Sequence, residues 1–510
     1  MIRPPLRAFA ALLGLAASTS PGQLASDPLI HQRWFEARTA HFQIYTCGPT
    51  QEVTRLAVRL EQFREAYSLL AGAQAVASPP IIVMAFPDRD SMQPFLPLRD
   101  GNPAQLAAFF NRGSDENLIV LYLSNSDSLE VIFHEYTHLL LRHNEPFWPL
   151  WLDEGMAEIY APFTVVGGDR ARIGQRLEHH LQLLAQQPLL PLKKLFAVTR
   201  DSPEYSEREH QGIFYAESWL LAHYLMLGGN PAHQAGFRQL TPLLRQGWSP
   251  EKAFTTALRT SLPAMEAELR RYLAGGKFQP LELTVRVRLD LPQAMLTRSL
   301  TPEEVCFRLG DELLHLGRLE AAESYFRQAR KLAPASPLPF EGLGRLAAIR
   351  QQPEEAVRCF QQAMQRGPVS FLDHYLYAQE KYALTAHGPD QYTRLEGEPA
   401  AEIRAELQKS LKLMPDFGPA HSLLGFFEMV QGEDLAAAEQ HLTRATQLEP
   451  ENYSHLLSLA QVQVARNNLE AARRTLASLR LPYVAGEVRA RAKDMLRQIG
   501  PPADAHPSSD

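Results

Sequence analysis

The chain has 510 residues, of which 45% are hydrophobic and 21% charged, with a formal net charge of −6. This length exceeds what one hydrophobic core can organise, so we expect two or three domains. The acidic balance, with no basic patch in the sequence, argues against a nucleic-acid-binding protein. The three cysteines, Cys47, Cys306 and Cys359, lie too far apart for a cysteine metal site or a disulfide framework, so we expect three packed thiols.

Residues 1–25 have the pattern of a signal peptide. Arg3 and Arg7 precede the apolar run 8–17, and small residues follow it. The alternative interpretation is a disordered, alanine-rich N-terminus of a cytosolic protein. No other stretch reaches the roughly 18 apolar residues that a membrane span requires. We therefore expect an exported protein, periplasmic or secreted, without an integral membrane span.

Residues 28–276 predict an α+β domain whose helices gather in its second half. From residue 128 the sequence reads as nearly all helical up to Gly275. Before that point, runs rich in branched residues predict strands, and one long amphipathic run predicts a helix with Thr50 as its N-cap. The strands are expected in residues 41–48, 80–86 and 117–124, and the helix in residues 50–70.

Residues 277–301 are expected to be a linker to a different kind of structure. The stretch LELTVRVRLDL, residues 281–291, alternates apolar and polar residues with a period of two. This alternation predicts one strand with one exposed face.

Residues 302–480 contain an internal repeat with a period of about 34 residues. The pattern resembles the tetratricopeptide repeat, in which small residues let two antiparallel helices approach and a proline ends the second helix. An unrelated helical bundle is the alternative. The pairs that lie one period apart are Gly310 and Gly344, Ala322 and Ala356, Phe326 and Phe360, Ala329 and Ala363, and Pro334 and Pro368.

The spacing predicts about five repeats, followed by a capping helix and a tail. The separation of Pro368 and Pro415 exceeds one period by about 13 residues, which indicates an insertion that fits best in residues 385–399. Residues 481–500 are expected to form the capping helix, and residues 501–510 a mobile tail. Such an array forms a superhelix whose concave face suits a peptide or protein partner.

The stretch FHEYTHLL, residues 133–140, carries the chemistry. His134 and His138 are four residues apart, so on a helix both imidazoles lie on one face and can reach one ion. Zinc accepts neutral imidazole, and Glu135 beside that face is placed to take a proton from a metal-bound water. The alternative is a surface helix with two ordinary histidines, but the flanking residues are too apolar for a surface helix.

A third ligand should come from the stretch WLDEGMAEIY, residues 151–160. Its acidic residues are Asp153, Glu154 and Glu158. Glu154 and Glu158 share a helical face, whereas Asp153 is expected to point elsewhere. One acid would bind the metal, and another would orient a histidine ligand through its second nitrogen.

The sequence HEYTH followed by WLDEG resembles the gluzincin metallopeptidases, most closely their peptidase MA-like domains. This resemblance implies a zincin-like domain with Zn²⁺ bound by His134, His138 and Glu154, with Glu135 as catalytic residue and Glu158 as the acid that orients a ligand. The stretch between His138 and Glu154 is shorter than in the aminopeptidase branch. This departure leaves Glu158 open as the ligand instead.

The same resemblance extends to FYAESWLLAHYL, residues 214–225. It implies that Tyr215 stabilises the oxyanion, although a packed aromatic side chain is an equal alternative. His210 and His223 are expected at the surface. Phe110 stands where aminopeptidases of this clan carry the glutamate that binds a free amine, which argues against exopeptidase action.

We therefore expect an α+β zincin-like metallopeptidase domain followed by an all-α tetratricopeptide-repeat superhelix. The function expected is that of a zinc-dependent metallopeptidase of the bacterial cell envelope, acting as an endopeptidase on a peptide or protein substrate. The alternative is a repeat scaffold or assembly factor whose first domain binds metal without turnover. Hydrolysis of a non-peptide substrate is a third, weaker hypothesis.

Overall fold

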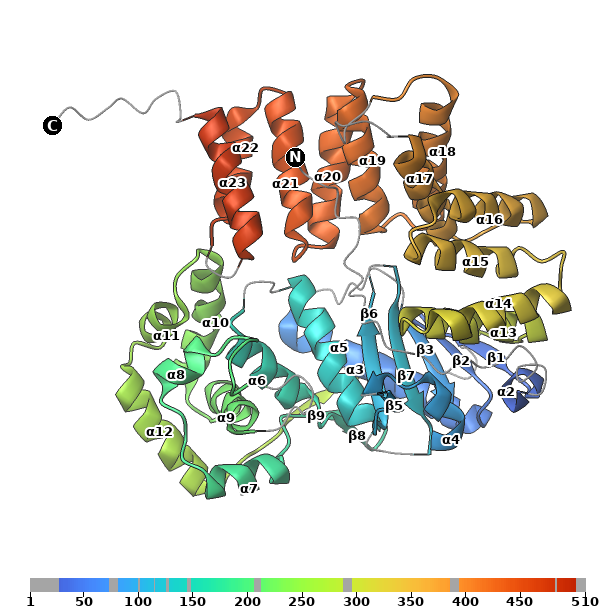
Figure 1. Ribbon diagram of the computed structural model, residues 1–510. Coiled ribbons are helices and arrows are strands. Elements are labelled where there is room, and N and C mark those ends of the chain that lie inside the picture. The colour runs from blue at the N-terminus through green and yellow to red at the C-terminus, as the bar shows by residue number, and fades with distance from the viewer. Residues whose placement is uncertain are drawn as a thin grey trace.

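The computed structural model describes most of the chain. The described residues are 27–72, 81–99, 101–113, 115–124, 128–144, 148–205, 212–287, 296–385, 394–481 and 484–500. The predicted signal peptide and tail lie outside these ranges. Among the described residues, no helix is both long and apolar enough to cross a membrane. An N-terminal α+β domain lies beneath an arch of helices (Figure 1).

A six-stranded sheet organises the first half of the α+β domain. Its order is β11-β1-β2-β3-β7-β6, with β2, β3 and β7 parallel and the remaining neighbours antiparallel. The three strands expected from the sequence are confirmed as β2, β3 and β7. The strands are β1 (Phe35–Arg38), β2 (Phe42–Thr46), β3 (Ile81–Phe86), β6 (Ala108–Arg112), β7 (Asn117–Tyr122) and β11 (Leu296–Ser299).

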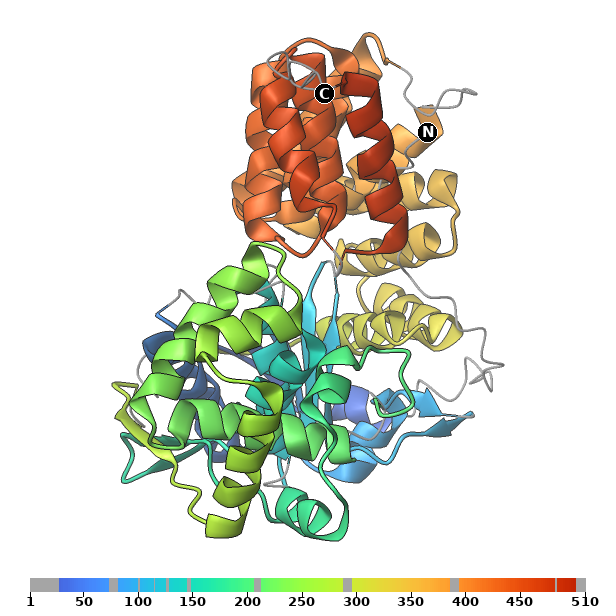
Figure 2. The same ribbon diagram turned by 90° about the vertical axis from the view of Figure 1, so that its left-hand side faces the viewer.

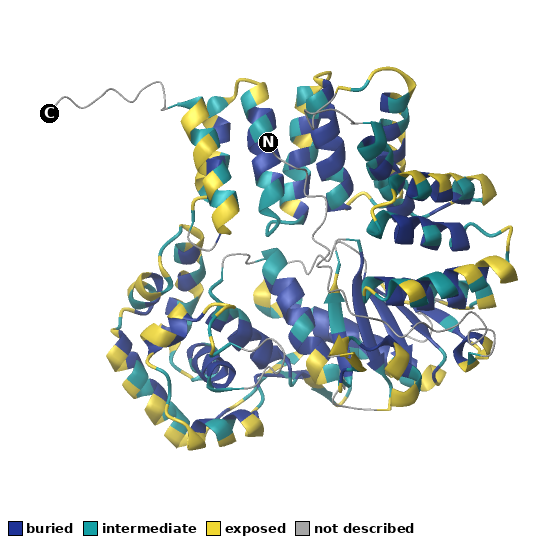
Figure 3. Ribbon diagram, viewed as in Figure 1, coloured by how far each residue is buried: buried dark blue, intermediate teal, exposed yellow. Residues whose placement is uncertain are grey.

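Both faces of the sheet are covered, which explains why all six residues of β3 are buried (Figure 3). Val83 points to the side that carries α3 (Thr50–Ala71) and α5 (Ser128–Asn144). Met84 points to the opposite side, where it packs with the first repeat helices, α13 (Pro302–His315) and α14 (Leu319–Leu332). The helix α3 is present as predicted, but Pro49 rather than Thr50 is its N-cap.

The second half of the α+β domain is mainly helical, as predicted, with a small antiparallel sheet inserted. Strands β8 and β9 interrupt the helical run, and β10 pairs with β9. The elements are α6 (Leu150–Tyr160), β8 (Thr164–Val166), β9 (Arg170–Ile173), α7 (Glu178–Gln186), α8 (Leu192–Ala197), α9 (Ile213–Leu227), α10 (Pro231–Arg245), α11 (Pro250–Leu258), α12 (Leu262–Gly275) and β10 (Leu281–Thr284). Shorter elements near the sheet are α2 (Pro28–His31), α4 (Arg89–Met92), η1 (Gln93–Phe95), β4 (Leu98–Arg99) and β5 (Asn102–Pro103).

The segment expected as a linker with one strand holds two strands in the structure. Strand β10 ends at Thr284, within the alternating stretch. Strand β11 joins the edge of the large sheet by pairing with β1. A short edge strand is stabilised by its partner rather than by its own residues, so the local pattern carries no signal for it. Residues 281–284 and 296–299 are therefore part of the domain's sheets rather than a free connection.

The C-terminal part is an array of five antiparallel helix pairs and a final helix. The predicted period is visible in the packing: a Cβ on Gly310 would come within 2.7 Å of the Phe326 ring, and one on Gly344 within 2.7 Å of the Phe360 ring. The insertion separates α17 from α18, and residues 386–393 within it lie outside the described ranges. After the first pair, the helices are α15 (Leu338–Ile349), α16 (Pro353–Arg366), α17 (Phe371–Thr385), α18 (Glu398–Leu413), α19 (Gly418–Gln431), α20 (Leu435–Leu448), α21 (Tyr453–Ala465), α22 (Leu469–Ser478) and α23 (Gly486–Ile499).

The array spans both halves of the α+β domain (Figures 1 and 2). It begins on the sheet, where His315 Nε2 lies 3.2 Å from Asp115 Oδ2. In its middle, Glu451 forms an ion pair with Arg112 at the end of β6. At its far end, Leu481 lies against Gly247, which follows α10. The superhelix is thus held to the domain at three separated places.

Candidate functional site

The site begins with α5, which two contacts fix against α3. The rings of Phe63 and Phe133 stack with centroids 4.4 Å apart, and Arg64 Nη1 donates a hydrogen bond of 2.7 Å to Tyr136 Oη. Tyr136 lies between the two histidines in sequence but points to the opposite face of the helix, into the core. The other face of α5 therefore presents His134 and His138 toward α6.

His134, His138 and Glu154 form the candidate metal centre, a triangle of buried ligand atoms. The Nε2 atoms of the two histidines are 3.2 Å apart. Glu154 Oε2 lies 3.5 Å from His134 Nε2 and 3.4 Å from His138 Nε2. The structure thus places Glu154, rather than Glu158, in the position of a third ligand.

These separations fit a tetrahedral ion. Zinc bonds of about 2.0–2.1 Å hold ligand atoms about 3.3–3.4 Å apart. Glu154 Oε2 is buried and accepts no hydrogen bond from the described residues. A buried carboxylate oxygen without a donor is costly, and a bound cation would satisfy it.

The outer nitrogens of both histidines face further carboxylates. Glu158 Oε1 lies 3.5 Å from His134 Nδ1, in the outer position that the sequence predicted for it. Asp153 Oδ1 lies 3.1 Å from His138 Nδ1. The expectation that Asp153 points elsewhere is therefore wrong. Helix α6 crosses α5 closely enough for residues on both flanks of Glu154 to reach a histidine.

The charge balance favours a cation. Burial alone would lower the pKa of His138, but Asp153 and Glu154 outweigh burial and hold that pKa well above its usual value. Burial would raise the pKa of Glu154, and the two histidines hold it well below the usual range instead. Three carboxylates around two imidazoles leave net negative charge in a buried site, which a divalent cation would neutralise.

Glu135 and Tyr215 do not belong to the triangle of ligand atoms. Glu135 follows His134 on α5 and is half-buried, unlike the two histidines. Tyr215 is fully buried in the first turn of α9, with its ring centroid 5.8 Å from that of Tyr205. Tyr205 Oη donates a hydrogen bond of 3.2 Å to Glu154 Oε1. No sequence pattern marks Tyr205, because it lies in a polar loop.

Of the two other histidines considered from the sequence, His223 differs from the expectation. The prediction that His223 lies at the surface is wrong: it is fully buried, with Nε2 3.0 Å from the Gly174 carbonyl oxygen and Nδ1 2.7 Å from Tyr272 Oη. Its neighbours on α9 are apolar all round the helix, so the helix is enclosed. His210 lies outside the described residues.

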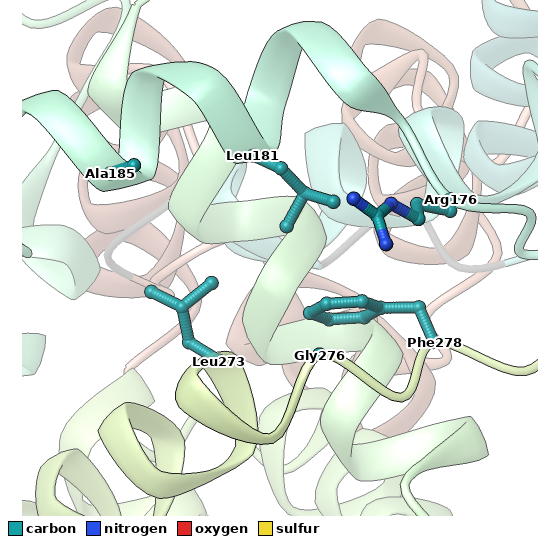
Figure 4. A pocket seen from close by; sticks show the side chains of 6 residues that line it. All are labelled: Arg176, Leu181, Ala185, Leu273, Gly276 and Phe278. Carbon is teal, nitrogen blue, oxygen red and sulfur yellow. The ribbon is translucent and has the colours of Figure 1, made fainter.

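A hollow of about 240 Å³ lies beside α7 and α12, away from the triangle. Figure 4 shows Leu181, Leu273 and Phe278 around it, with the guanidinium of Arg176 above the phenyl ring. None of its six lining residues belongs to the candidate metal centre. The hollow and the candidate metal centre are therefore separate features of the domain.

Comparison with known proteins identifies the repeats. The sequence matches the tetratricopeptide-repeat family at residues 303–336 and 429–499. No curated protein matches the chain. The C-terminal array therefore consists of tetratricopeptide repeats. In the structure, the three cysteines are free thiols.

Several solved structures are similar to the array. YrrB, described as a TPR protein with an unusual peptide-binding site, is 16% identical over 37% of this chain and 91% of its own, with a TM-score of 0.31. TTC0263 of Thermus thermophilus, described as a thermophilic TPR protein, is 23% identical over 38% of this chain and 97% of its own, with a TM-score of 0.29. PilW, described as a type IV pilus biogenesis factor, is 21% identical over 37% of this chain and 81% of its own, with a TM-score of 0.30.

Proposed function

We propose that this chain is a zinc-dependent metallopeptidase of the cell envelope, with a repeat array that binds its substrate or a protein partner. The observation that carries the proposal is the triangle of His134 Nε2, His138 Nε2 and Glu154 Oε2, with sides of 3.2 to 3.5 Å. Two histidines, one carboxylate and no fourth protein ligand among the described residues match a catalytic zinc site, in which one position stays open.

The residues around the triangle have separate roles in this proposal. Bound zinc would supply a Lewis acid and a water of lowered pKa. Glu135 would be the general base that takes a proton from the attacking water and passes it to the leaving amine. Asp153 and Glu158 lie beside the outer nitrogens of His138 and His134 and would orient both rings so that their Nε2 atoms point into the triangle.

A phenol is proposed to stabilise the oxyanion. Tyr215 is the residue that the gluzincin resemblance implies for this role. Tyr205 is a second candidate, because its phenol contacts Glu154 directly. Comparison of Tyr215→Phe with Tyr205→Phe separates them: the oxyanion donor is the one whose loss lowers kcat without changing zinc affinity.

Endopeptidase action is proposed rather than removal of N-terminal residues. Phe110 on β6 provides no carboxylate for a free amine, and its side chain packs partly against the core of the α+β domain. Strand β6 is the last strand of the sheet, next to α5. An edge strand can pair with an extended peptide through its backbone, which suits an internal segment of a polypeptide.

The decisive experiment measures zinc and hydrolysis together. Purified protein is expected to hold one zinc ion per chain and to cleave unfolded polypeptide. Glu135→Gln should retain the zinc and lose cleavage by roughly 10²–10⁴-fold. His134→Ala should lose both. A wild-type chain that takes up no zinc would exclude the proposal.

The second candidate function is a tetratricopeptide-repeat scaffold or assembly factor whose first domain binds metal without turnover. The similarity found is to tetratricopeptide-repeat proteins, so the comparisons support this candidate more directly than they support a peptidase. The two candidates differ in Glu135→Gln. If a cellular phenotype survives that change while partner capture stays intact, the scaffold function is the correct one.

A further inference from the structure

A third histidine approaches the candidate metal centre from α7. His180 is 1% exposed, although its neighbour His179 is exposed and α7 lies at the molecular surface. Its ring lies near that of Trp219 on α9, with centroids 5.8 Å apart. Its Nε2 lies 3.0 Å from Glu158 Oε2. A buried imidazole and a buried carboxylate from separate helices thus lie within ion-pair distance, although the N–H is not aligned for a hydrogen bond.

Glu158 divides its two oxygens between two histidines. Oε2 faces His180, and Oε1 lies 3.5 Å from His134 Nδ1. A glutamate side chain has three rotatable bonds, so one contact leaves its carboxylate free to swing. An ion-pair partner on the far oxygen restricts that motion and keeps Oε1 aimed at His134.

We propose that His180 is a positioning residue that acts on His134 through Glu158. The proposal rests on the zinc site proposed above. His180 holds Glu158 Oε2 as an ion-pair partner, the other oxygen of Glu158 faces His134 Nδ1, and His134 Nε2 keeps its lone pair directed into the triangle. The outer nitrogen of His138 faces Asp153 instead. His180 therefore positions only one of the two histidine ligands, His134.

A second cation bound by Glu158, His179 and His180 is the competing explanation. Their ligand atoms lie within 4.8 Å of one another. Two observations favour positioning: both oxygens of Glu158 already face histidines, and His179 is exposed. The two explanations differ in metal stoichiometry and in the importance of His179.

The test compares three variants of the full chain by competition for zinc with a chromophoric chelator. His180→Leu removes the ion-pair partner and is expected to weaken zinc binding roughly 10–100-fold. His180→Gln keeps an N–H at nearly the reach of Nε2 and should stay within about threefold of wild type. His179→Leu is the matched control on the same helix and should bind zinc as wild type does. Thermal unfolding of each metal-free variant shows whether it folds.

A double-mutant cycle separates positioning from a general packing effect. If His180 acts only through Glu158, His180→Leu should add no further loss of zinc affinity in a Glu158→Gln background. Additive losses would overturn the proposal, as would wild-type affinity in His180→Leu. Two zinc ions per chain, with one lost in His179→Leu, would also overturn it in favour of a second cation site. A chain that binds one zinc tightly but cleaves nothing removes the peptidase proposal and leaves this one standing.

Discussion

Each histidine of the candidate metal centre faces a carboxylate from α6 on its outer nitrogen. Asp153 serves His138 and Glu158 serves His134, while Glu154 between them faces both inner nitrogens. One short helix thus supplies a ligand and two orienting groups. The two orienting contacts are geometrically similar, so their loss should have similar consequences.

Asp153→Leu is therefore expected to weaken zinc binding roughly 10–100-fold, because His138 loses the carboxylate that faces its outer nitrogen and orients its ring. Glu154→Gln should weaken binding further, since it removes a charged ligand rather than its support. Isothermal titration with zinc measures both. Glu178→Gln, an exposed acid on α7, is the control and should change nothing. Equal affinities for Asp153→Leu and wild type would show that His138 is oriented without Asp153.

At this scale the sequence predicted the inner part of the site better than the outer part. The HExxH spacing alone places His134 and His138 on one helical face. Asp153 escaped prediction because a helical wheel shows which residues share a face, but not where a second helix crosses it. His180 and Tyr205 come from a separate helix and a loop, so only the fold brings them to Glu158 and Glu154.

Among the elements, α6 and α9 pack closely because Gly155 has no side chain. A Cβ at this position would lie 2.4 Å from the Ser218 carbonyl oxygen and 3.1 Å from Ala222 Cβ. Both neighbours belong to the buried helix α9 and cannot yield without a backbone shift. Gly155 follows Glu154 directly, so the helix contact and the ligand position depend on each other.

Gly155→Ala is expected to lower the free energy of unfolding by about 1–3 kcal/mol through overpacking, and to weaken zinc binding as α6 moves away from α9. Thermal unfolding with and without zinc measures the two effects. Gly275→Ala is the matched control, because a Cβ there meets nothing within 4 Å at the end of α12. If Gly155→Ala has the same free energy of unfolding as wild type, α9 can shift away from the added Cβ without loss of stability.

Helix α9 also carries a buried acid that should make stability depend on pH. Glu217 is 1% exposed, and its Oε2 accepts a hydrogen bond of 2.6 Å from the Leu190 backbone nitrogen. Burial nevertheless raises its pKa from 4.5 to about 8. The unfolded chain therefore loses this proton near pH 4.5, whereas the folded chain keeps it until about pH 8. Stability from this group falls as pH rises between these values.

Glu217→Gln removes this dependence, so its stability relative to wild type should rise steadily from pH 5 to pH 8, by at most about 1.4 kcal/mol per pH unit. Melting temperatures across that range measure the difference. The exposed Glu251→Gln is the control and should run parallel to wild type. A constant difference between Glu217→Gln and wild type would show that the carboxyl is already ionised at pH 5.

The elements that the sequence predicted correctly are those with a long internal pattern. Strand β3 is an unbroken apolar run, β7 continues as one after Asn117, and the repeats carry their period in small residues. Strand β11 is short and three of its four residues are polar, so its place in the sheet depends on its pairing with β1. The same holds for β6, whose short sequence carries no strand pattern of its own and whose place depends on β7.

For the whole molecule, the main difference from the sequence-based domain boundaries is a shared core. The sheet face that bears Met84 and Val120 packs with the first repeat pair, including Leu313 and Phe326, in one apolar cluster. The repeats are recognised in the sequence from their period. That period does not show which residues pack against the first repeat helix. The array therefore cannot swing freely on a linker, because its first pair belongs to the core of the α+β domain.

Two phenylalanines at equivalent positions of successive repeats test this conclusion. Phe326 and Phe360 are fully buried, and each packs on a repeat glycine. Phe360 lies in a cluster of array residues only, with Ala347 and Tyr377, whereas the cluster of Phe326 includes residues of the sheet. Each change to alanine should cost about 3–5 kcal/mol locally. Because repeats couple mainly to their neighbours, only Phe326→Ala should loosen the sheet directly.

Amide hydrogen exchange reads out the difference. Phe326→Ala is expected to accelerate exchange in β3 and β7 together with α13 and α14, since it opens a cavity in the core that all four share. Phe360→Ala should accelerate exchange in α15 and α16 and leave β3 and β7 as in wild type. If β3 and β7 exchange as slowly in both variants as in wild type, the first repeat pair contacts the sheet without sharing its core. If both loosen them equally, the chain unfolds as one unit through the ion pair of Arg112 with Glu451 and the contact of Gly247 with Leu481.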